Sequence, residues 1–410
     1  MGIWTVEKLE TKLIGYRRHL HAHPELSGEE HETTKTIRKW LRDDGIRLAD
    51  YPLKTGVVAE IGGLRGGPVI AIRADIDALP VQEETELPFA SQSPGIMHAC
   101  GHDVHTAILL GAAQLLKERE SELEGTVRLL FQPNEEKAKG AGQVIQSGAL
   151  EGVSAVFGLH NKPDLPVGTI GIKAGPLMAA ADGFAIHVEG RGSHAAVPEA
   201  SIDAIVASAH IITALQSVVS RNVSSLDSAV VSVTKLNSGT AWNVIADKAD
   251  LEGTLRTFRE DVRAKVRQRF EQVVTGVGAA LGALSSVRWI SGPPAVVNDP
   301  LWAERSIRTA RSLGLTVVEP APSPAGEDFA FYLEKTPGIF FFLGTAGPEE
   351  WHHPKFDADE AALPIGASFF AALAVDAIAA LKEEREGGAI RARSARSVGE
   401  TVAGGGWGDA

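Results

Sequence analysis

The segment Met97–His105 concentrates residues that commonly bind metal ions, because it contains three histidines and the only cysteine of the chain. Thiolate sulfur and imidazole nitrogen are ligands for zinc and other borderline-soft divalent ions. In an extended segment Cys100 and His102 point to the same side, since side chains alternate with a period of two residues, so the two could share an ion. The alternative is a buried structural cysteine beside histidines that cap the following helix.

Acidic and histidine side chains also follow three apolar runs that are typical of buried strands. These residues are Glu135 and Glu136 after Thr126–Phe131, His160 after Ser154–Leu159, and His352 and His353 after Ile339–Leu343. Ligands in open α/β sheets bind at the carboxyl ends of the strands, so we expect these side chains to converge on one edge. Each of them alone could instead be a solvated turn residue or a polar residue with an ordinary hydrogen-bond partner.

Strands and helices alternate around this cluster, a pattern that predicts an α/β fold with a largely parallel sheet. Further expected elements are the helix Thr5–His21, the strands Val57–Ile61 and Pro68–Ala74, the helix Asp103–Glu118, the strand Thr316–Val318 and the helix Ala361–Glu386. Asp75 and Asp77 follow one of these strands. Asp75 could orient a ligand histidine through a hydrogen bond, although a turn or helix-capping role explains an acid there equally well.

A different pattern interrupts the chain between Gly175-Pro176 and Ser291-Gly-Pro-Pro294. The expected elements there are a strand from Phe184, the helix Ile202–Val219, the strands Ala229–Thr234 and Ala249–Phe258, the helix Arg259–Leu281 and the strand Ser286–Ile290. Their order is β-α-β-β-α-β, which is typical of a ferredoxin-like domain. We therefore predict a main domain of residues 1–180 and 292–386, an inserted domain of residues 181–291 and a disordered tail of residues 387–410.

Charge and hydropathy exclude several classes of partner. The chain has 52 acidic and 40 basic residues, a net charge of −12, and no basic stripe, so nucleic acid is not expected to bind. No apolar run approaches the ~20 residues needed to cross a bilayer, so no membrane partner is expected. The N-terminus lacks a basic segment followed by an apolar one, so we expect no signal peptide and a cytoplasmic location.

Eight motifs, in this order, resemble those of the aminoacylase/carboxypeptidase family of dinuclear metallopeptidases, in the branch of hippurate hydrolases and plant auxin-conjugate amidohydrolases. The motifs are Arg17–Ser27, Arg73–Pro80, His98–Asp103, Gln132–Glu136, Gly158–His160, Gly190–His194, Gly326–Phe329 and His352–Pro354. The resemblance implies hydrolysis of the amide bond of N-acyl-L-amino acids by water activated at two divalent ions, which could be zinc, manganese or cobalt. The match departs from the family pattern at Asn134, where smaller residues are common.

The resemblance also assigns roles to individual residues. The implied metal ligands are Cys100, His102, Glu136, His160 and His352, with Glu135 as the general base. His352 is preferred to His353 because the family ligand stands two residues before the proline. Five protein ligands exceed the four that a single tetrahedral zinc ion accepts, which independently suggests two ions.

The inserted domain is implied to form a homodimer or a higher homo-oligomer. His194 would then reach the active site of the partner subunit, although a histidine before a helix is commonly a surface or capping residue. Asn243 and Arg256 would bind the substrate carboxylate, and the histidines between residues 19 and 31 are expected to be structural. The alternative functions are a metallo-carboxypeptidase or dipeptidase, and a non-catalytic metal-binding or amino-acid-binding protein, which would not need the base Glu135.

Overall fold

The computed structural model describes residues 6–400, with the side chains of residues 8–386. The chain forms two compact units, of which the first comprises Met1–Ile172, Glu304–Val318 and Thr336–Ala410, and the second Lys173–Ala303 and Glu319–Lys335. The second unit is therefore wider than the inserted domain predicted at residues 181–291. One reason is that β7 (Gly175–Met178), where the chain enters the unit, pairs antiparallel with β14 (Val296–Asn298), near where the chain leaves it. No local sequence pattern predicts this contact.

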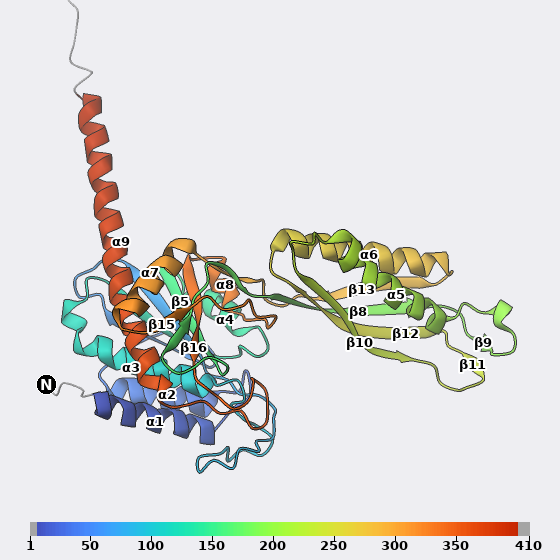
Figure 1. The fold of residues 1–410 in the computed structure, drawn as a ribbon, viewed down its shortest axis with the longest axis horizontal. Coiled ribbons are helices and arrows are strands. Elements are labelled where there is room, and N and C mark those ends of the chain that lie inside the picture. The colour runs from blue at the N-terminus through green and yellow to red at the C-terminus, as the bar shows by residue number, and fades with distance from the viewer. Residues whose placement is uncertain (1–5, 401–410) are drawn as a thin grey trace, which may run out of the picture. The chain divides into compact units, whose positions relative to one another are not determined.

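The first unit is built on an eight-stranded sheet with the order β1-β2-β4-β3-β5-β16-β6-β15 (Figure 1). The strands are β1 Arg47–Ala49, β2 Val57–Gly62, β3 Val69–Asp75, β4 Thr126–Gln132, β5 Val153–Lys162, β6 Thr169–Gly171, β15 Thr316–Val318 and β16 Gly338–Gly344. The central strands β4, β3, β5 and β16 are parallel, whereas β2 and β6 flank them in antiparallel pairing. The predicted α/β fold with a largely parallel sheet is confirmed.

Helices enclose this sheet, which explains why its central strands are continuous apolar runs. The helices of the first unit are α1 Val6–Ala22, α2 His31–Asp43, α3 His102–Glu118, α4 Gly140–Gln146, most of α7 Pro300–Ser312 and α9 Ala362–Glu400. Strand β16 is buried at every residue. Because β3, β4, β5 and β16 are parallel, their carboxyl ends lie at one edge, where the candidate ligands were expected.

Helix α9 continues past the predicted end at Glu386 to Glu400. The backbone is thus helical through the first part of the predicted tail, in keeping with the helix-favouring Ala and Arg residues of that segment. Residues 401–410, which complete the predicted tail, lie outside the described residues.

Two helices have the length and hydropathy of a membrane span: α5 (Ala204–Asn222) and the part of α9 from Ala362 to Glu386. Helix α5 buries Ile211 and Leu215 within the second unit, and α9 buries Phe369 and Phe370 within the first. Helices that fill a protein core have the same composition, so burial accounts for the apolar character of both. The absence of a membrane partner stays a prediction.

The second unit contains a four-stranded sheet with the order β10-β12-β8-β13, in which all neighbours are antiparallel (Figure 1). Its main elements are β8 Ala180–Glu189, α5, β10 Ala229–Ser238, β12 Lys248–Thr257, α6 Glu260–Ala280 and β13 Leu284–Ile290. Their order is the β-α-β-β-α-β order expected from the sequence. The unit also contains a short two-stranded antiparallel sheet, in which β9 (Ser193–His194) pairs with β11 (Val244–Ile245), and the helix α8 (Ala330–Leu333).

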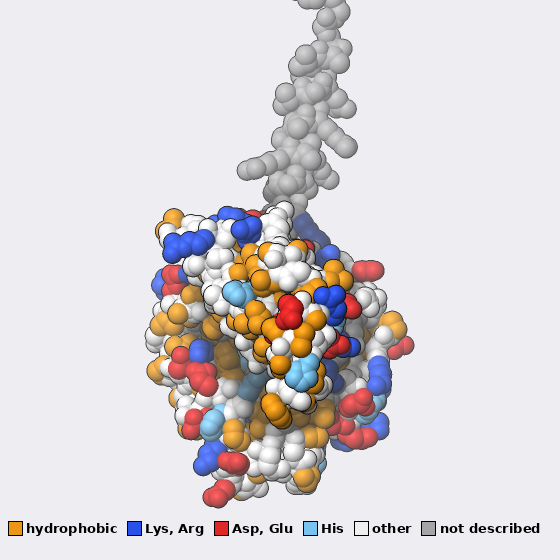
Figure 2. Space-filling model, turned by 90° about the vertical axis from the view of Figure 1, so that its right-hand side faces the viewer, with side chains coloured by type: hydrophobic (Ala, Val, Ile, Leu, Met, Phe, Trp, Pro, Cys, Tyr) orange, Lys and Arg blue, Asp and Glu red, His pale blue; other side chains and the backbone are white. Residues whose placement is uncertain are grey.

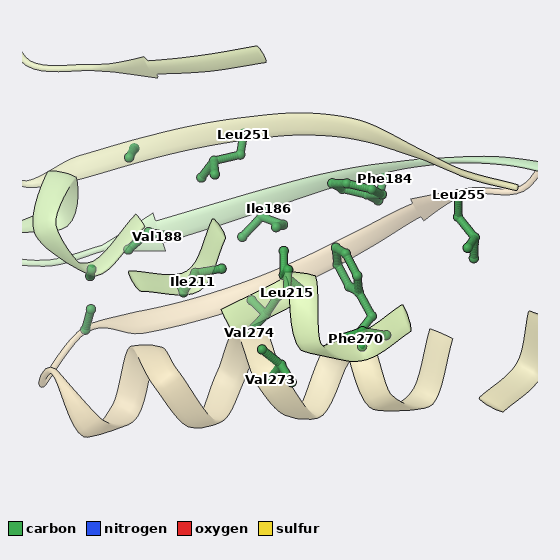
Figure 3. Packing of buried hydrophobic residues seen from close by; sticks show 14 of the residues in the cluster. Phe184, Ile186, Val188, Ile211, Leu215, Leu251, Leu255, Phe270, Val273 and Val274 are labelled. Carbon is green, nitrogen blue, oxygen red and sulfur yellow. The ribbon is translucent and has the colours of Figure 1, made fainter. Parts of the chain in front are cut away.

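Helices α5 and α6 cover one face of this sheet and form the core of the second unit with it (Figure 3). Phe184 on β8 and Phe270 on α6 have ring centroids 4.5 Å apart, and Trp289 on β13 packs against both. The opposite face carries polar residues such as His187 and Asp250, which are exposed and hydrogen bonded to each other. This arrangement explains the alternation of buried and exposed residues along β8.

We expect Phe270→Ala to destabilise the second unit by ~3–5 kcal/mol, because the truncation leaves a cavity beside Phe184 and Trp289. Urea unfolding followed by tryptophan fluorescence measures the change. Leu226→Ala is the matched control, because Leu226 is 94% exposed, and it should change stability by less than about 0.5 kcal/mol. Equal effects of the two substitutions would show that the aromatic cluster does not determine the stability of this unit.

Candidate metal centre

The start of α3 holds Cys100 and His102 on either side of Gly101, which has a φ of +83°. A Cβ atom at Gly101 would lie 2.4 Å from the side-chain nitrogen of Asn161, so only glycine fits. That amide nitrogen donates hydrogen bonds to the carbonyl oxygen of Cys100 at 2.6 Å and to Nε2 of His105 at 2.9 Å. Asn161 therefore joins the end of β5 to the first turn of α3.

The five candidate ligands converge at the carboxyl edge of the first unit's sheet. The sulfur of Cys100 lies 3.4 Å from Nε2 of His160. The Oε1 atom of Glu136 lies 3.8 Å from Nε2 of His102 and 3.7 Å from Nε2 of His352. The structure thus brings together all the ligands inferred from the sequence, although some of them, such as Glu136 and His352, lie far apart along the chain.

The ligand atoms form overlapping groups whose members lie within 4.8 Å of one another. These groups are Cys100, His102 and His160; Cys100, Glu136 and His352; and His102, Glu135 and Glu136. Cys100 belongs to two of them, and so does Glu136. Adjacent groups that share a thiolate or carboxylate donor suit two neighbouring cations, because such a donor can contact two ions.

The ring orientation of both buried histidines fits a divalent cation. Nδ1 of His102 donates to the carbonyl oxygen of Asp77 at 3.0 Å, and Nδ1 of His160 donates to the carbonyl oxygen of Asn161 at 2.9 Å. Each Nε2 is therefore the atom directed at the cluster. Within the described part of the chain, Nε2 of His102 and Oε1 of Glu136 are buried without a hydrogen-bond partner. These orphaned atoms are donors that a bound cation would satisfy.

The electrostatics of the protein alone also indicate a missing positive charge. Burial lowers the pKa of His102, but Asp75 and then Asp77 outweigh this effect and raise it to about 10. Burial raises the pKa of Glu136 to about 7, against the charge of His102. Burial, reinforced by the charge of Glu136, also raises the pKa of the Cys100 thiol. Protons on these groups therefore take the place of a cation.

Asp77, rather than Asp75, forms the hydrogen bond that orients His102. Oδ1 of Asp75 instead accepts from Nδ1 of His105 at 2.6 Å, and its Oδ2 accepts from Arg73 at 2.7 Å. The side-chain Oδ2 atom of Asp77 accepts from Ser27 at 2.7 Å and from the backbone N–H of Glu136 at 3.0 Å. Asp77 thus contacts His102 and Asp75 contacts His105, while Oδ2 of Asp75 also lies 3.5 Å from Nε2 of His102.

The loop after β4 carries the adjacent acids Glu135 and Glu136 and contains two left-handed residues, Asn134 (φ +61°) and Ala138 (φ +51°). Asparagine tolerates the left-handed φ at position 134 better than most side chains do. Its backbone N–H donates to the buried carboxylate of Glu30 at 2.9 Å. This geometry turns Glu136 toward His102 and leaves Glu135 9% exposed beside the same group.

His352 enters the cluster from the loop that follows β16. Its φ is +67°, its backbone N–H donates to the carbonyl oxygen of Ala99 at 2.8 Å, and its side chain is 55% exposed. The indole N–H of Trp351 donates to the carbonyl oxygen of Asn161 at 3.1 Å, and its ring lies 4.4 Å from that of His160. His353 points elsewhere, with Nδ1 3.9 Å from Glu349, which supports the choice of His352.

The other residues singled out from the sequence lie in the second unit. His194 pairs with Val244 in the β9–β11 ladder, and the backbone oxygen of Asn243 accepts from Ala195 at 3.1 Å, so His194 and Asn243 are close together. Arg256 pairs with Val230 near the far end of β12. It lies about 26 Å along the strand from Lys248, the first residue of β12, which follows β11. The guanidinium of Arg256 donates to Thr254 and to the carbonyl oxygen of Leu255.

Comparison with known proteins places these observations in a family context. A model of "Peptidase family M20/M25/M40" matches residues 71–376. The N-acetylcysteine deacetylase of Bacillus subtilis (strain 168) is 55% identical over 373 residues, which are 91% of this chain and 98% of that protein. The N-acyl-L-amino acid amidohydrolase of Geobacillus stearothermophilus is 44% identical over 314 residues, 75% of this chain and 85% of that protein.

A solved structure is similar over nearly the whole chain. It is the YXEP protein of Bacillus subtilis, described as a dinuclear metal binding peptidase from the M20 family. The similarity has a TM-score of 0.83 with 51% sequence identity and covers 91% of this chain and 99% of the other.

We expect metal binding to release protons, because a cation must displace those held by the ligands. At pH 8, His102 and Cys100 are protonated in the protein alone, so binding should release about two protons per chain. Toward pH 6 Glu136 also holds a proton, so about one more should be released and the affinity should fall. Calorimetric titration with Mn²⁺ in buffers of different ionisation enthalpy counts the protons. A pH-independent release by the wild type would contradict this account.

Proposed function

Because this chain belongs to peptidase family M20/M25/M40, we propose that it hydrolyses the amide bond of N-acyl-L-amino acids to a carboxylate and a free amino acid. It is a metal-dependent hydrolase. The observation that carries the proposal is the group of His102, Glu135 and Glu136, in which a ligand histidine, a ligand carboxylate and a second carboxylate meet at the sheet edge. That second carboxylate is the group that a non-catalytic binding protein would not need.

The residues that would hold two divalent ions are Cys100, His102, Glu136, His160 and His352. When bound, the ions polarise the substrate carbonyl and lower the pKa of water. The donor set mixes sulfur, nitrogen and oxygen, which suits zinc, manganese or cobalt, and we propose that one of these is the physiological metal. A cytoplasmic location is also proposed, because a free thiol ligand such as Cys100 stays reduced there.

Glu135 is proposed to move the proton. Its carboxylate takes a proton from the attacking water while the water oxygen bonds to the amide carbon. When the carbon–nitrogen bond breaks, Glu135 returns that proton to the leaving amine nitrogen, so the reaction consumes one water and leaves Glu135 unchanged. Its burial beside Glu136 limits its exchange with bulk solvent.

The second unit is proposed to form a homodimer, and its surface supports this assignment. The side chains around the β9–β11 pair include Val197, Trp242 and Val244, which are 40%, 95% and 46% exposed. Figure 2 views the side of the molecule on which β9 and β11 are drawn in Figure 1, and shows hydrophobic side chains gathered among histidines and charges. Strand β10 is an edge strand whose outer side is free for pairing with a second copy.

His194 is proposed to act in the active site of the partner subunit, where it would donate a hydrogen bond to the tetrahedral intermediate. Asn243 would bind the substrate carboxylate, and its place beside His194 means that any site receiving one receives the other. Arg256 lies far along β12 from the β9–β11 pair. It would therefore contact the same carboxylate only from the other subunit of the dimer. The β9–β11 pair of one chain and Arg256 of the other are thus proposed to bind the same substrate molecule.

Substitution of the adjacent acids should separate the base from the ligand. Glu135→Gln should keep two ions per chain but lose roughly 10²–10⁴ in turnover of N-acetyl-L-methionine, the usual range for a general base. Glu136→Ala should lose metal as well as activity. Elemental analysis and steady-state kinetics, with a dipeptide as the competing substrate class, make the test. Near-normal turnover by Glu135→Gln would refute its role as base, and preference for the dipeptide would favour a dipeptidase.

Mixing two inactive variants tests whether His194 acts between subunits. His194→Ala should bind metal normally and lose about 10²–10³ in turnover. A heterodimer of His194→Ala with Glu135→Gln contains one site with an intact base and an intact partner histidine. Activity should therefore recover to about half that of a wild-type dimer per heterodimer. No recovery, with subunit exchange verified by mass spectrometry, would mean that His194 works within its own chain or has no role in the reaction.

A further inference from the structure

We propose that Arg17, which is not a ligand, is a positioning residue that fixes the His352 loop against the first turn of α3. Through that contact it sets the affinity of the ion held by Cys100, Glu136 and His352. The inference rests on the proposed two-ion function, and it names a determinant of one of the two sites.

Arg17 lies on α1 and is 1% exposed. Its Nε donates to Oδ2 of Asp103 at 3.2 Å, and its Nη2 donates to Oδ1 of Asp357 at 2.5 Å. Its Nη1 donates to the carbonyl oxygen of Ala358 at 3.3 Å and lies 3.2 Å from Oε1 of Glu360. One guanidinium thus bonds two segments that are distant in sequence.

Both segments carry metal ligands. Asp103 directly follows His102, and its Oδ2 also lies 2.8 Å from Nδ1 of His21. Asp357 and Glu360 belong to the loop that carries His352. A shift of this loop relative to α3 would therefore move His352 relative to Cys100, whereas the remaining ligands would keep their mutual positions.

The His352 loop depends on such support more than the other ligand segments do. Cys100 and His102 sit at the start of a long helix, and His160 lies within β5, where backbone hydrogen bonds fix them. His352 has a left-handed φ of +67°, which a non-glycine residue adopts only when its surroundings enforce it. The described anchors near it include the backbone bond to Ala99, the indole bond of Trp351 to Asn161, the bond from the Glu84 N–H to the carbonyl oxygen of Pro354, and the burial of Phe356 against Met97.

The charge of Arg17 matches the acids that it bonds. Burial lowers its pKa, but Asp103 and Asp357 outweigh burial and hold the pKa above its ordinary value, so the guanidinium stays charged. The planar fork of an arginine reaches several acceptors at once, which the single ammonium of a lysine does not. Arg17→Lys therefore keeps the charge among the acids while losing the geometry of the contact.

Arg18 provides a matched control. It is the next residue of α1, and it binds Glu360 through Nε at 3.0 Å and Nη2 at 2.6 Å. Its side chain is 46% exposed, and among the described residues it makes no hydrogen bond to Asp103 or Asp357. Arg18→Gln thus removes a cation and a contact to the same loop without breaking the join between the loop and α3.

The experiment measures stepwise Co²⁺ binding by chelator competition and by the visible absorption of the bound ions, in the full-length wild type, Arg17→Lys, Asp357→Asn and Arg18→Gln. Arg17→Lys and Asp357→Asn should bind one ion with the wild-type affinity and the other about 10–100-fold more weakly, the usual cost of losing an outer hydrogen-bond partner. The absorption of the weakened ion should change, and Arg18→Gln should match the wild type.

Wild-type affinity for both ions in Arg17→Lys and Asp357→Asn would overturn the inference. Equal loss of both ions, with unchanged circular dichroism, would overturn it as well, because Arg17 would then support the whole site. If Arg17→Lys does not fold, Asp357→Asn decides, since Asp357 is 30% exposed and its substitution leaves Arg17 in place. A wild type that binds fewer than two ions contradicts the proposed function itself, a failure that is visible before any variant is compared.

Discussion

The burial of negative charge at the carboxyl edge of the parallel sheet is the constraint on which the rest of this structure depends. Asp75, Asp77 and Asp103 are at most 1% exposed, and each is held in the ionised form by partners that lower its pKa below the ordinary value. A buried carboxylate is tolerable only when it is paired and hydrogen bonded. The surrounding elements supply those partners, chiefly histidine and arginine side chains.

The acids around the centre have cationic or histidine partners, whereas the centre itself lacks a cation. Asp75 binds Arg73 and His105, and Asp103 binds Arg17 and His21 through Oδ2, while its Oδ1 is buried without a hydrogen-bond partner among the described residues. At the centre, Nε2 of His102 and Oε1 of Glu136 have no hydrogen-bond partner within the described chain, and the thiol of Cys100 faces several carboxylates. The candidate ligands therefore keep buried atoms that no protein group satisfies and that a cation would satisfy.

The local pattern of the sequence indicated candidate ligands, and the resemblance to the metallopeptidase family supplied the choice among them. Apolar runs located the strands, and the residues after each run are the ones that reach the sheet edge. The sequence did not suffice for the pairing of acids with histidines, since the contact of Asp77 rather than Asp75 with Nδ1 of His102 is a tertiary contact. Nor could it suggest the contact of Arg17 with Asp357, whose residues are 340 positions apart. The width of the second unit likewise depends on the β7–β14 pairing, a tertiary contact.

Protons and cations compete for the same three groups, and this competition has a consequence for assembly of the site. In the protein alone, Asp75 and Asp77 raise the pKa of His102 against the effect of burial, and burial is the main cause of the raised pKa values of Glu136 and Cys100. Each of these groups therefore holds a proton more readily than it would in water. Cation binding and proton release are then one event, and each ligand deprotonates only as the cation arrives. Cys100 and Glu136 each belong to two ligand groups, so occupation of one group prepares donors for the other. The two ions are therefore expected to bind in sequence, one after the other.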